Sequence, residues 1–175
     1  MSTFFIYSII VFLSIQVFPV AIGINVSGKP VKATKLVLVI SLIQLLTYWL
    51  GLRLGDTFMY LMDGFSSVVL FIIFLLIGIR MLMEVFIIRK GERTYTIDGI
   101  GHVALASVAQ GINSFLVGLV YYYIDLNENH TIIVLLSATL FISIFGIFLK
   151  PGKLTFALAS LLYTLGGLIM ILAAI

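Results

Sequence analysis

The fold is decided by the stretch Gly64–Ile88, whose sequence is GFSSVVLFIIFLLIGIRMLMEVFII. It is a long apolar run in which the charged residues are Arg80 and Glu84. A helix needs about 20 predominantly apolar residues to cross a bilayer core that is about 30 Å thick. A barrel strand would alternate apolar and polar residues, and this run does not alternate. The stretch therefore predicts a transmembrane helix.

The composition of the whole chain is that of an integral membrane protein. Of its 175 residues, 62% are hydrophobic and 10% are charged, and the mean hydropathy is +1.28. A soluble domain typically has about 45–50% apolar and about 25% charged residues. The same figures exclude a disordered chain, a coiled coil and a nucleic-acid-binding protein. Because the chain has no cysteine, disulfides, thiolate metal sites and cysteine nucleophiles are excluded as well.

Six stretches meet the length requirement, which predicts an all-α polytopic membrane protein with six transmembrane helices. They span residues 3–25, 34–54, 64–88, 98–124, 131–149 and 154–175. The links between them are too short to hold a soluble domain. The first basic residue, Lys29, follows the first run, so this run lacks the basic start of a cleavable secretory signal. We expect it to be a retained span.

Basic residues gather on alternate links, which predicts the orientation. The first, third and fifth links contain Lys29, Lys32, Lys35, Arg89, Lys90, Arg93, Lys150 and Lys153. The second and fourth contain Arg53 but are otherwise acidic, with Asp56, Asp63, Asp125 and Glu128. Cytoplasmic links are enriched in Lys and Arg. We therefore expect the first, third and fifth links to face the cytoplasm and both termini to lie outside the cytoplasm.

The two halves of the chain share a weak repeat. The first span contains Ser14-Ile15-Gln16-Val17-Phe18-Pro19-Val20, and the fourth contains Gly111-Ile112-Asn113-Ser114-Phe115-Leu116-Val117. Gln44 precedes Gly51 by seven residues, as Thr139 precedes Gly146. Three spans per half would insert the second copy in the opposite orientation. The predicted units are a three-helix repeat at 1–88, a cytoplasmic linker at 89–97 and a second repeat at 98–175, with chance similarity of apolar segments as the alternative.

Polar side chains near the middle of four spans are candidates for a substrate pathway. They are Gln16, Gln44, Asn113 and Thr139. Polar groups inside a bilayer are costly, and paired polar positions at mid-depth are typical of secondary transporters. Pro19 frees the carbonyl of Ile15, next to Gln16, for a ligand or a neighbouring helix. The alternative is structural, because such side chains also form hydrogen bonds between membrane helices without any ligand.

Other residues are predicted to pair helices. Arg80 and Glu84 are four residues apart on one helix face. Gly51, Gly55 and Gly78 permit close helix approach. No nucleophile with its base, metal cluster or phosphate-cradling loop is recognisable, so we expect neither an enzyme nor a cofactor.

These motifs, taken in order, resemble a known family. The third span contains Gly78-Ile79-Arg80-Met81-Leu82-Met83-Glu84-Val85-Phe86, which fits Gly-x-Arg-Met-x-x-Glu-x-Phe. The first contains Ser14-Ile15-Gln16-Val17-Phe18 with Ile22-Gly23, and the fourth contains Gly111-Ile112-Asn113 with Val117-Gly118. The second contains Gln44, Thr47, Gly51 and Gly55, and the fifth contains Ala138-Thr139-Leu140 and Gly146. Over six spans, the chain is similar to the bacterial MntP-type manganese efflux pumps of the lysine-exporter superfamily. The resemblance implies a multi-pass protein of the bacterial cytoplasmic (inner) membrane.

The chain departs from that family at three positions. Where the resemblance implies acidic residues, this sequence has Gln16, Gln44 and Asn113. Neutral amides keep the shape but do not offset the charge of a hard divalent cation. We therefore expect a transporter-like protein with altered or lost manganese specificity, whose partners are the lipid bilayer and manganese or another small solute. The alternative is a transport-inactive homologue that serves as a structural or accessory subunit with protein partners in a larger membrane complex.

Overall fold

Long apolar runs become long helices, and polar turn residues separate most of them. The computed structural model describes residues 3–24, 30–89, 99–124, 126–149 and 151–175. The regular structure of these residues is all helical. The elements in chain order are α1 (Thr3–Ile15), α2 (Phe18–Ile22), α3 (Pro30–Phe58), the 3-10 helix η1 (Met59–Phe65), α4 (Ser66–Arg89), α5 (Ile100–Val120), the 3-10 helix η2 (Tyr121–Tyr123), α6 (Glu128–Phe148) and α7 (Lys153–Ala174).

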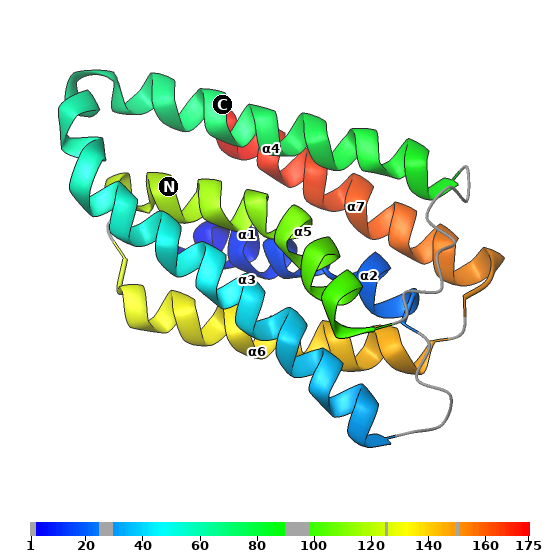
Figure 1. The fold of residues 1–175 in the computed structure, drawn as a ribbon. Helices are drawn as coiled ribbons and strands as arrows, with labels where there is room; N and C mark the ends of the chain where they lie inside the picture. The colour runs from blue at the N-terminus through cyan, green and yellow to red at the C-terminus, as the bar shows by residue number, and fades with distance from the viewer. Residues whose placement is uncertain (1–2, 25–29, 90–98, 125, 150) are drawn as a thin grey trace.

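Five helical runs among the described residues are long and apolar enough to cross a membrane. They are Thr3–Ile22, Pro30–Ile88, Ile100–Tyr123, Glu128–Phe148 and Lys153–Ala174. The second run has 59 residues and combines the two stretches predicted at 34–54 and 64–88. The expected loop between them is instead helical, because α3 extends to Phe58 and η1 follows directly. Within η1 the backbone leaves helical geometry at Met62 (φ −115°, ψ 17°), and the chain reverses direction there (Figure 1).

The helices run back and forth along one axis, so that the links gather at two ends of the bundle. Both chain ends lie toward the end where α3 meets α4 and α5 meets α6, while α3, α5 and α7 all begin at the opposite end (Figure 1). Lys32, Lys35 and Lys153 lie in the first turns of α3 and α7. The predicted segregation of charge therefore appears in the fold, with lysines at one end and Asp56 and Glu128 at the other.

Some predicted features lie outside the described residues. They are Lys29, Lys90, Arg93, Asp125, Lys150, the side chain of Arg89 and nearly all of the linker 89–97.

Two helix pairs are in backbone contact through glycine. On α3 and α5, a Cβ at Gly118 would lie 2.3 Å from the carbonyl oxygen of Tyr48, and one at Gly51 would lie 2.2 Å from that of Phe115. On α4 and α7, a Cβ at Gly78 would lie 2.8 Å from the carbonyl oxygen of Gly167. Small residues allow membrane helices to approach this closely. Gly51, Gly55 and Gly78 therefore lie where helices approach closely, with Gly55 against Leu119, and their roles in helix pairing stay predictions.

The bundle places large apolar side chains outside and polar ones inside. Phe4, Phe148 and Leu154 are more than four-fifths exposed, whereas Gln16, Ser114 and Thr139 are fully buried. A water-soluble protein would expose its polar groups instead. The distribution fits a lipid environment around a polar centre.

Candidate functional site

The polar centre of the bundle is built from the middle of its helices. Buried polar side chains there are Ser14, Gln16, Ser41, Gln44, Ser107, Gln110, Asn113, Ser114, Thr139, Ser143 and Ser160. They come from α1, the break after it, α3, α5, α6 and α7. Because these side chains are buried, each polar group must find a partner within the protein or be available to a ligand.

Ser114 is the hub of this centre. Its Oγ accepts a 2.7 Å hydrogen bond from Nε2 of Gln16 and a second hydrogen bond from Nε2 of Gln44. Gln44 Nε2 also lies 3.5 Å from the carbonyl oxygen of Leu13 on α1. One hydroxyl therefore joins the α1–α2 break, α3 and α5.

The two glutamines leave their oxygens unused. With both amide NH2 groups directed at Ser114, Oε1 of Gln16 and Oε1 of Gln44 are buried without a hydrogen-bond partner among the described residues. The side-chain oxygens of Ser41, Thr139 and Ser143 are also buried and have no hydrogen-bond partner among the described residues. An unmade hydrogen bond of a buried acceptor costs about 1–3 kcal/mol. Such oxygens are suited to accept from N–H or O–H groups or to coordinate a cation.

The break between α1 and α2 positions Gln16. Pro19 stands in the first turn of α2, where it ends the hydrogen-bond ladder of the preceding helix. The Tyr163 hydroxyl of α7 donates a 2.6 Å hydrogen bond to the carbonyl oxygen of Gln16. The sequence predicted a free carbonyl one residue earlier, at Ile15. The Gln110 amide lies 3.3 Å from the same hydroxyl. A side chain of a neighbouring helix thus satisfies a backbone carbonyl of the break.

Arg80 connects α4 to α5. Its Nη1 donates to Oδ1 of Asn113 at 2.9 Å, and its Nη2 donates to the carbonyl oxygen of Ala109 at 2.6 Å. Glu84, one turn further along α4, is buried, whereas the other described carboxylates are not. A helix-face ion pair between Arg80 and Glu84 stays a prediction. The guanidinium puts a positive charge against Asn113.

Metal ligands of the usual kind do not assemble here. Within the described ranges, no group of three His, Cys, Asp or Glu side chains is close enough to hold a metal ion. Any ion in this centre would be held by amide, hydroxyl and carbonyl oxygens.

A family model described as "Putative manganese efflux pump" (MntP) matches residues 28–175. The chain belongs to the MntP family. It is thus a membrane efflux transporter-like protein of a family of transporters. None of the curated proteins and none of the solved structures matches it.

The match covers α3 to α7 but begins after α2, so the first-span motif around Gln16 lies outside it. The structure brings Gln16 and Gln44 of this MntP-family chain together through Ser114, with Asn113 as the adjoining residue on α5. Thr139 is buried on α6, where its Oγ1 forms no hydrogen bond with the described residues. The transport roles of all four residues stay predictions.

Sequence reasoning missed Ser114, Tyr163 and the hydrogen bonds from Arg80 to α5. Ser114 directly follows Asn113 in the repeated segment, and its small hydroxyl could have been recognised as a hydrogen-bonding position between membrane helices. Tyr163 lies at the middle of an apolar helix, where a phenolic hydroxyl needs a partner. The predicted pairing of Arg80 with Glu84 concerns its own helix, and no sequence signal identifies the partners of Arg80 on α5.

Proposed function

We propose that this MntP-family protein moves a small solute across the bacterial cytoplasmic membrane through the polar centre around Ser114, and that manganese is a poor substrate for it. The supporting observation is the pair of buried Oε1 atoms on Gln16 and Gln44. Both amides donate to one hydroxyl, while their buried Oε1 atoms have no hydrogen-bond partner among the described residues, and a ligand that donates to these oxygens explains this better than helix packing alone.

The charge of the centre argues against a divalent cation. Mn²⁺ is a hard cation that binds best to carboxylates. The amides of Gln16 and Gln44 contribute no charge, and the Arg80 guanidinium beside Asn113 would repel a second cation. Neutral oxygens can hold a weakly hydrated monovalent cation, as carbonyl rings do in channels. They can also bind a small neutral or zwitterionic solute that donates N–H or O–H groups.

We further propose six spans in two inverted repeats. A run of 59 residues is too long for one crossing, since about 20 residues suffice, and α3 and α4 run in opposite directions on either side of η1 (Figure 1). The repeats 1–88 and 98–175 are supported by equivalent contacts. In the first repeat, Gly51 packs against Gly118 of the second. Gly146, the predicted counterpart of Gly51 in the second repeat, packs against Ala21 of the first, and a Cβ at Gly146 would lie 2.6 Å from the Cβ of Ala21. The reciprocal approach of Gly78 and Gly167 fits a two-fold axis between α4 and α7.

The proposed orientation puts the lysine-bearing end in the cytoplasm and both termini outside. It can be tested directly because the chain has no cysteine. In intact cells, an impermeant thiol reagent should label Asn129→Cys on the acidic end but not Lys153→Cys on the basic end. The reverse pattern would invert the topology.

Binding at the centre can be tested without knowing the substrate. Thermal unfolding of the purified protein would be followed with Na⁺, K⁺, ammonium, Mn²⁺ and small zwitterions. We expect a member of the panel other than Mn²⁺ to raise the melting temperature of the wild type, and Gln16→Ala to abolish that shift. Ser137→Ala, an exposed hydroxyl that bonds its own helix, is the matched control. Equal shifts in Gln16→Ala and wild type would remove the site.

A second role is favoured by the hydrogen bonds themselves. The bonds from Gln16 and Gln44 to Ser114, and from Arg80 to Asn113, tie four segments together without a ligand. A transport-inactive accessory subunit would use them for this purpose. It should co-purify in mild detergent with a stoichiometric membrane partner, and no solute should shift its melting temperature.

A further inference from the structure

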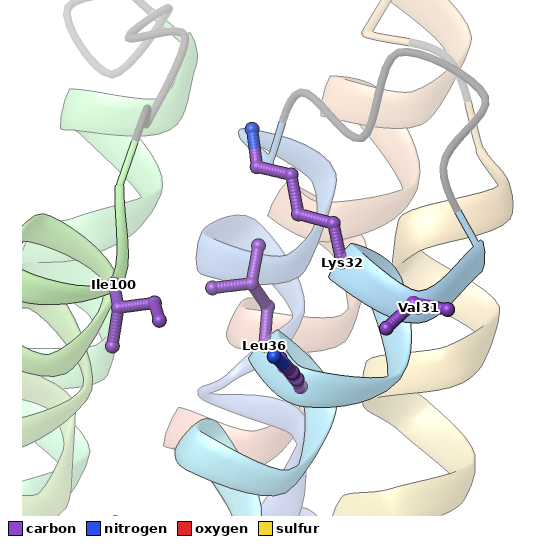
Figure 2. A pocket seen from close by; sticks show the side chains of 5 residues that line it. Val31, Lys32, Leu36 and Ile100 are labelled. Carbon is purple, nitrogen blue, oxygen red and sulfur yellow. The ribbon is translucent and has the colours of Figure 1, made fainter.

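An open cavity lies at the basic end of the bundle, away from the polar centre. It has a volume of about 310 Å³ and is lined by Val31, Lys32, Lys35, Leu36 and Ile100. The first four belong to the first two turns of α3, and Ile100 is the first residue of α5. Figure 2 shows Ile100 facing Leu36 and Lys32 across the space between the two helices. The volume is at the lower end of that of small-ligand sites, which is about 300–1,000 Å³.

The lining combines two kinds of chemistry. Lys32 and Lys35 are three residues apart and therefore lie on one face of α3, and both side chains line the cavity. Among the apolar lining residues, Leu36 is fully buried, while Val31 and Ile100 are 67% and 55% exposed. Two cations beside an apolar wall fit a ligand that is anionic at one end and apolar at the other.

We propose that this cavity is a binding site for an anionic phospholipid of the surrounding bilayer, with the headgroup phosphate between Lys32 and Lys35 and the start of the acyl chains along Val31, Leu36 and Ile100. The proposal rests on the membrane topology proposed above, which places this end at the cytoplasmic interface. Anionic lipids of that leaflet attract juxtamembrane lysines. A soluble phosphate compound would share the lysines but gain nothing from the apolar wall.

The location gives the site a connection to the rest of the molecule. It is bordered by α3 and α5, the two helices whose glycines bring their backbones into contact further along. A lipid held there would contact both members of this pair at their common end.

Lipid binding would be measured on the full chain in detergent, by native mass spectrometry and thermal unfolding. Phosphatidylglycerol is the anionic probe and phosphatidylcholine the zwitterionic one. We expect phosphatidylglycerol to bind and raise the melting temperature, and phosphatidylcholine to do so much less. The double variant Lys32→Gln/Lys35→Gln should bind phosphatidylglycerol roughly 25-fold more weakly, from a factor of about five per lysine. Lys32→Arg/Lys35→Arg should retain binding.

Two control variants separate this site from general attraction to a basic surface. Lys153→Gln also removes one positive charge at this end of the bundle. It should leave the affinity for phosphatidylglycerol within about twofold of wild type, which is a smaller change than the factor of about five expected for each cavity lysine. Ile100→Trp keeps both lysines but fills the cavity, and it should weaken binding. If Lys153→Gln weakens binding as much as the removal of one cavity lysine, or if Ile100→Trp has no effect in a folded protein, the cavity is not the site.

Free phosphate distinguishes the source of the anion. Inorganic phosphate and glycerol 3-phosphate should not raise the melting temperature at concentrations that saturate with phosphatidylglycerol. An equal shift would assign the cavity to a soluble anion and overturn the lipid proposal. Gln16→Ala should bind phosphatidylglycerol normally, so that failure of the transport site and failure of the lipid site produce different results.

Discussion

Arg80 on α4 donates a 2.9 Å hydrogen bond to Oδ1 of Asn113 on α5, at the middle of the bundle. A carboxylate at position 113, as the family resemblance implies, would form an ion pair with this guanidinium. The amide keeps the hydrogen bond and leaves the positive charge without a counter-charge at that position. If the acids that the family resemblance implies stood at positions 16, 44 and 113, the net charge of the centre would be more negative than it is with the amides of this chain.

The pairing makes Asn113→Asp a conservative change for stability. We expect its unfolding free energy to equal or exceed that of wild type, because the new carboxylate meets Arg80 directly. Asn113→Leu, which leaves the guanidinium without this acceptor, should cost about 1–3 kcal/mol. Chemical denaturation in detergent would measure both. A strongly destabilised Asn113→Asp would mean that Arg80 does not hold this position.

Manganese tolerance should depend on positions 16 and 44 more than on position 113. Because Arg80 neutralises a carboxylate at 113, the charges available to Mn²⁺ are those beside Ser114. We expect Gln16→Asp/Gln44→Glu to raise manganese tolerance of a sensitive strain about as much as the same pair with Asn113→Asp added. Each buried acid costs roughly 2.5–3.5 kcal/mol on insertion scales, so membrane levels must be compared.

The control for that experiment is the wild type. If it already protects cells as well as the acidified variants at equal membrane levels, then amides do not disable the ion site and the proposed change of specificity is wrong.

The packing of α3 on α5 predicts a sharp position dependence for glycine substitutions. Gly118→Ala would place a methyl 2.3 Å from the backbone oxygen of Tyr48, and a backbone atom cannot rotate away. Overpacking of this kind costs about 1–3 kcal/mol. Gly101→Ala on the same helix meets nothing within 4 Å and should leave stability unchanged or raise it. Melting temperatures of the two variants would settle the comparison, and equal values would contradict the observed contact.

Tyr163 is expected to hold the break between α1 and α2. Tyr163→Phe removes the hydroxyl that donates to the Gln16 carbonyl, and it should cost about 1 kcal/mol. It should also increase hydrogen exchange at residues 16–18. Tyr122→Phe, at a 41% exposed tyrosine, should change neither quantity. A break that exchanges equally in Tyr163→Phe and wild type would show that Pro19 alone positions Gln16.

Sequence predicted the helices well because span length and apolar composition are local properties. It was wrong at the link between the second and third spans, because Gly55 and Asp56 remain inside α3 and the turn occurs later, at Met62. Burial of Gln16, Gln44 and Asn113 followed from their mid-span positions. Their partners did not, because Ser114, Arg80 and Tyr163 reach them from other helices, and side-chain direction across a bundle is set by packing.

The glycine contacts also constrain how the molecule can deform. α3 touches α5 backbone to backbone, and α4 touches α7 in the same way, and each pair takes one helix from each proposed repeat. Separating the helices of either pair would open a void lined by peptide groups. Such a void is unfavourable because protein interiors are closely packed. We therefore expect relative motion to be easiest between the two pairs. The rigid bodies of any conformational cycle would cut across the repeat boundary, and the sliding surface would pass through Arg80 and Asn113.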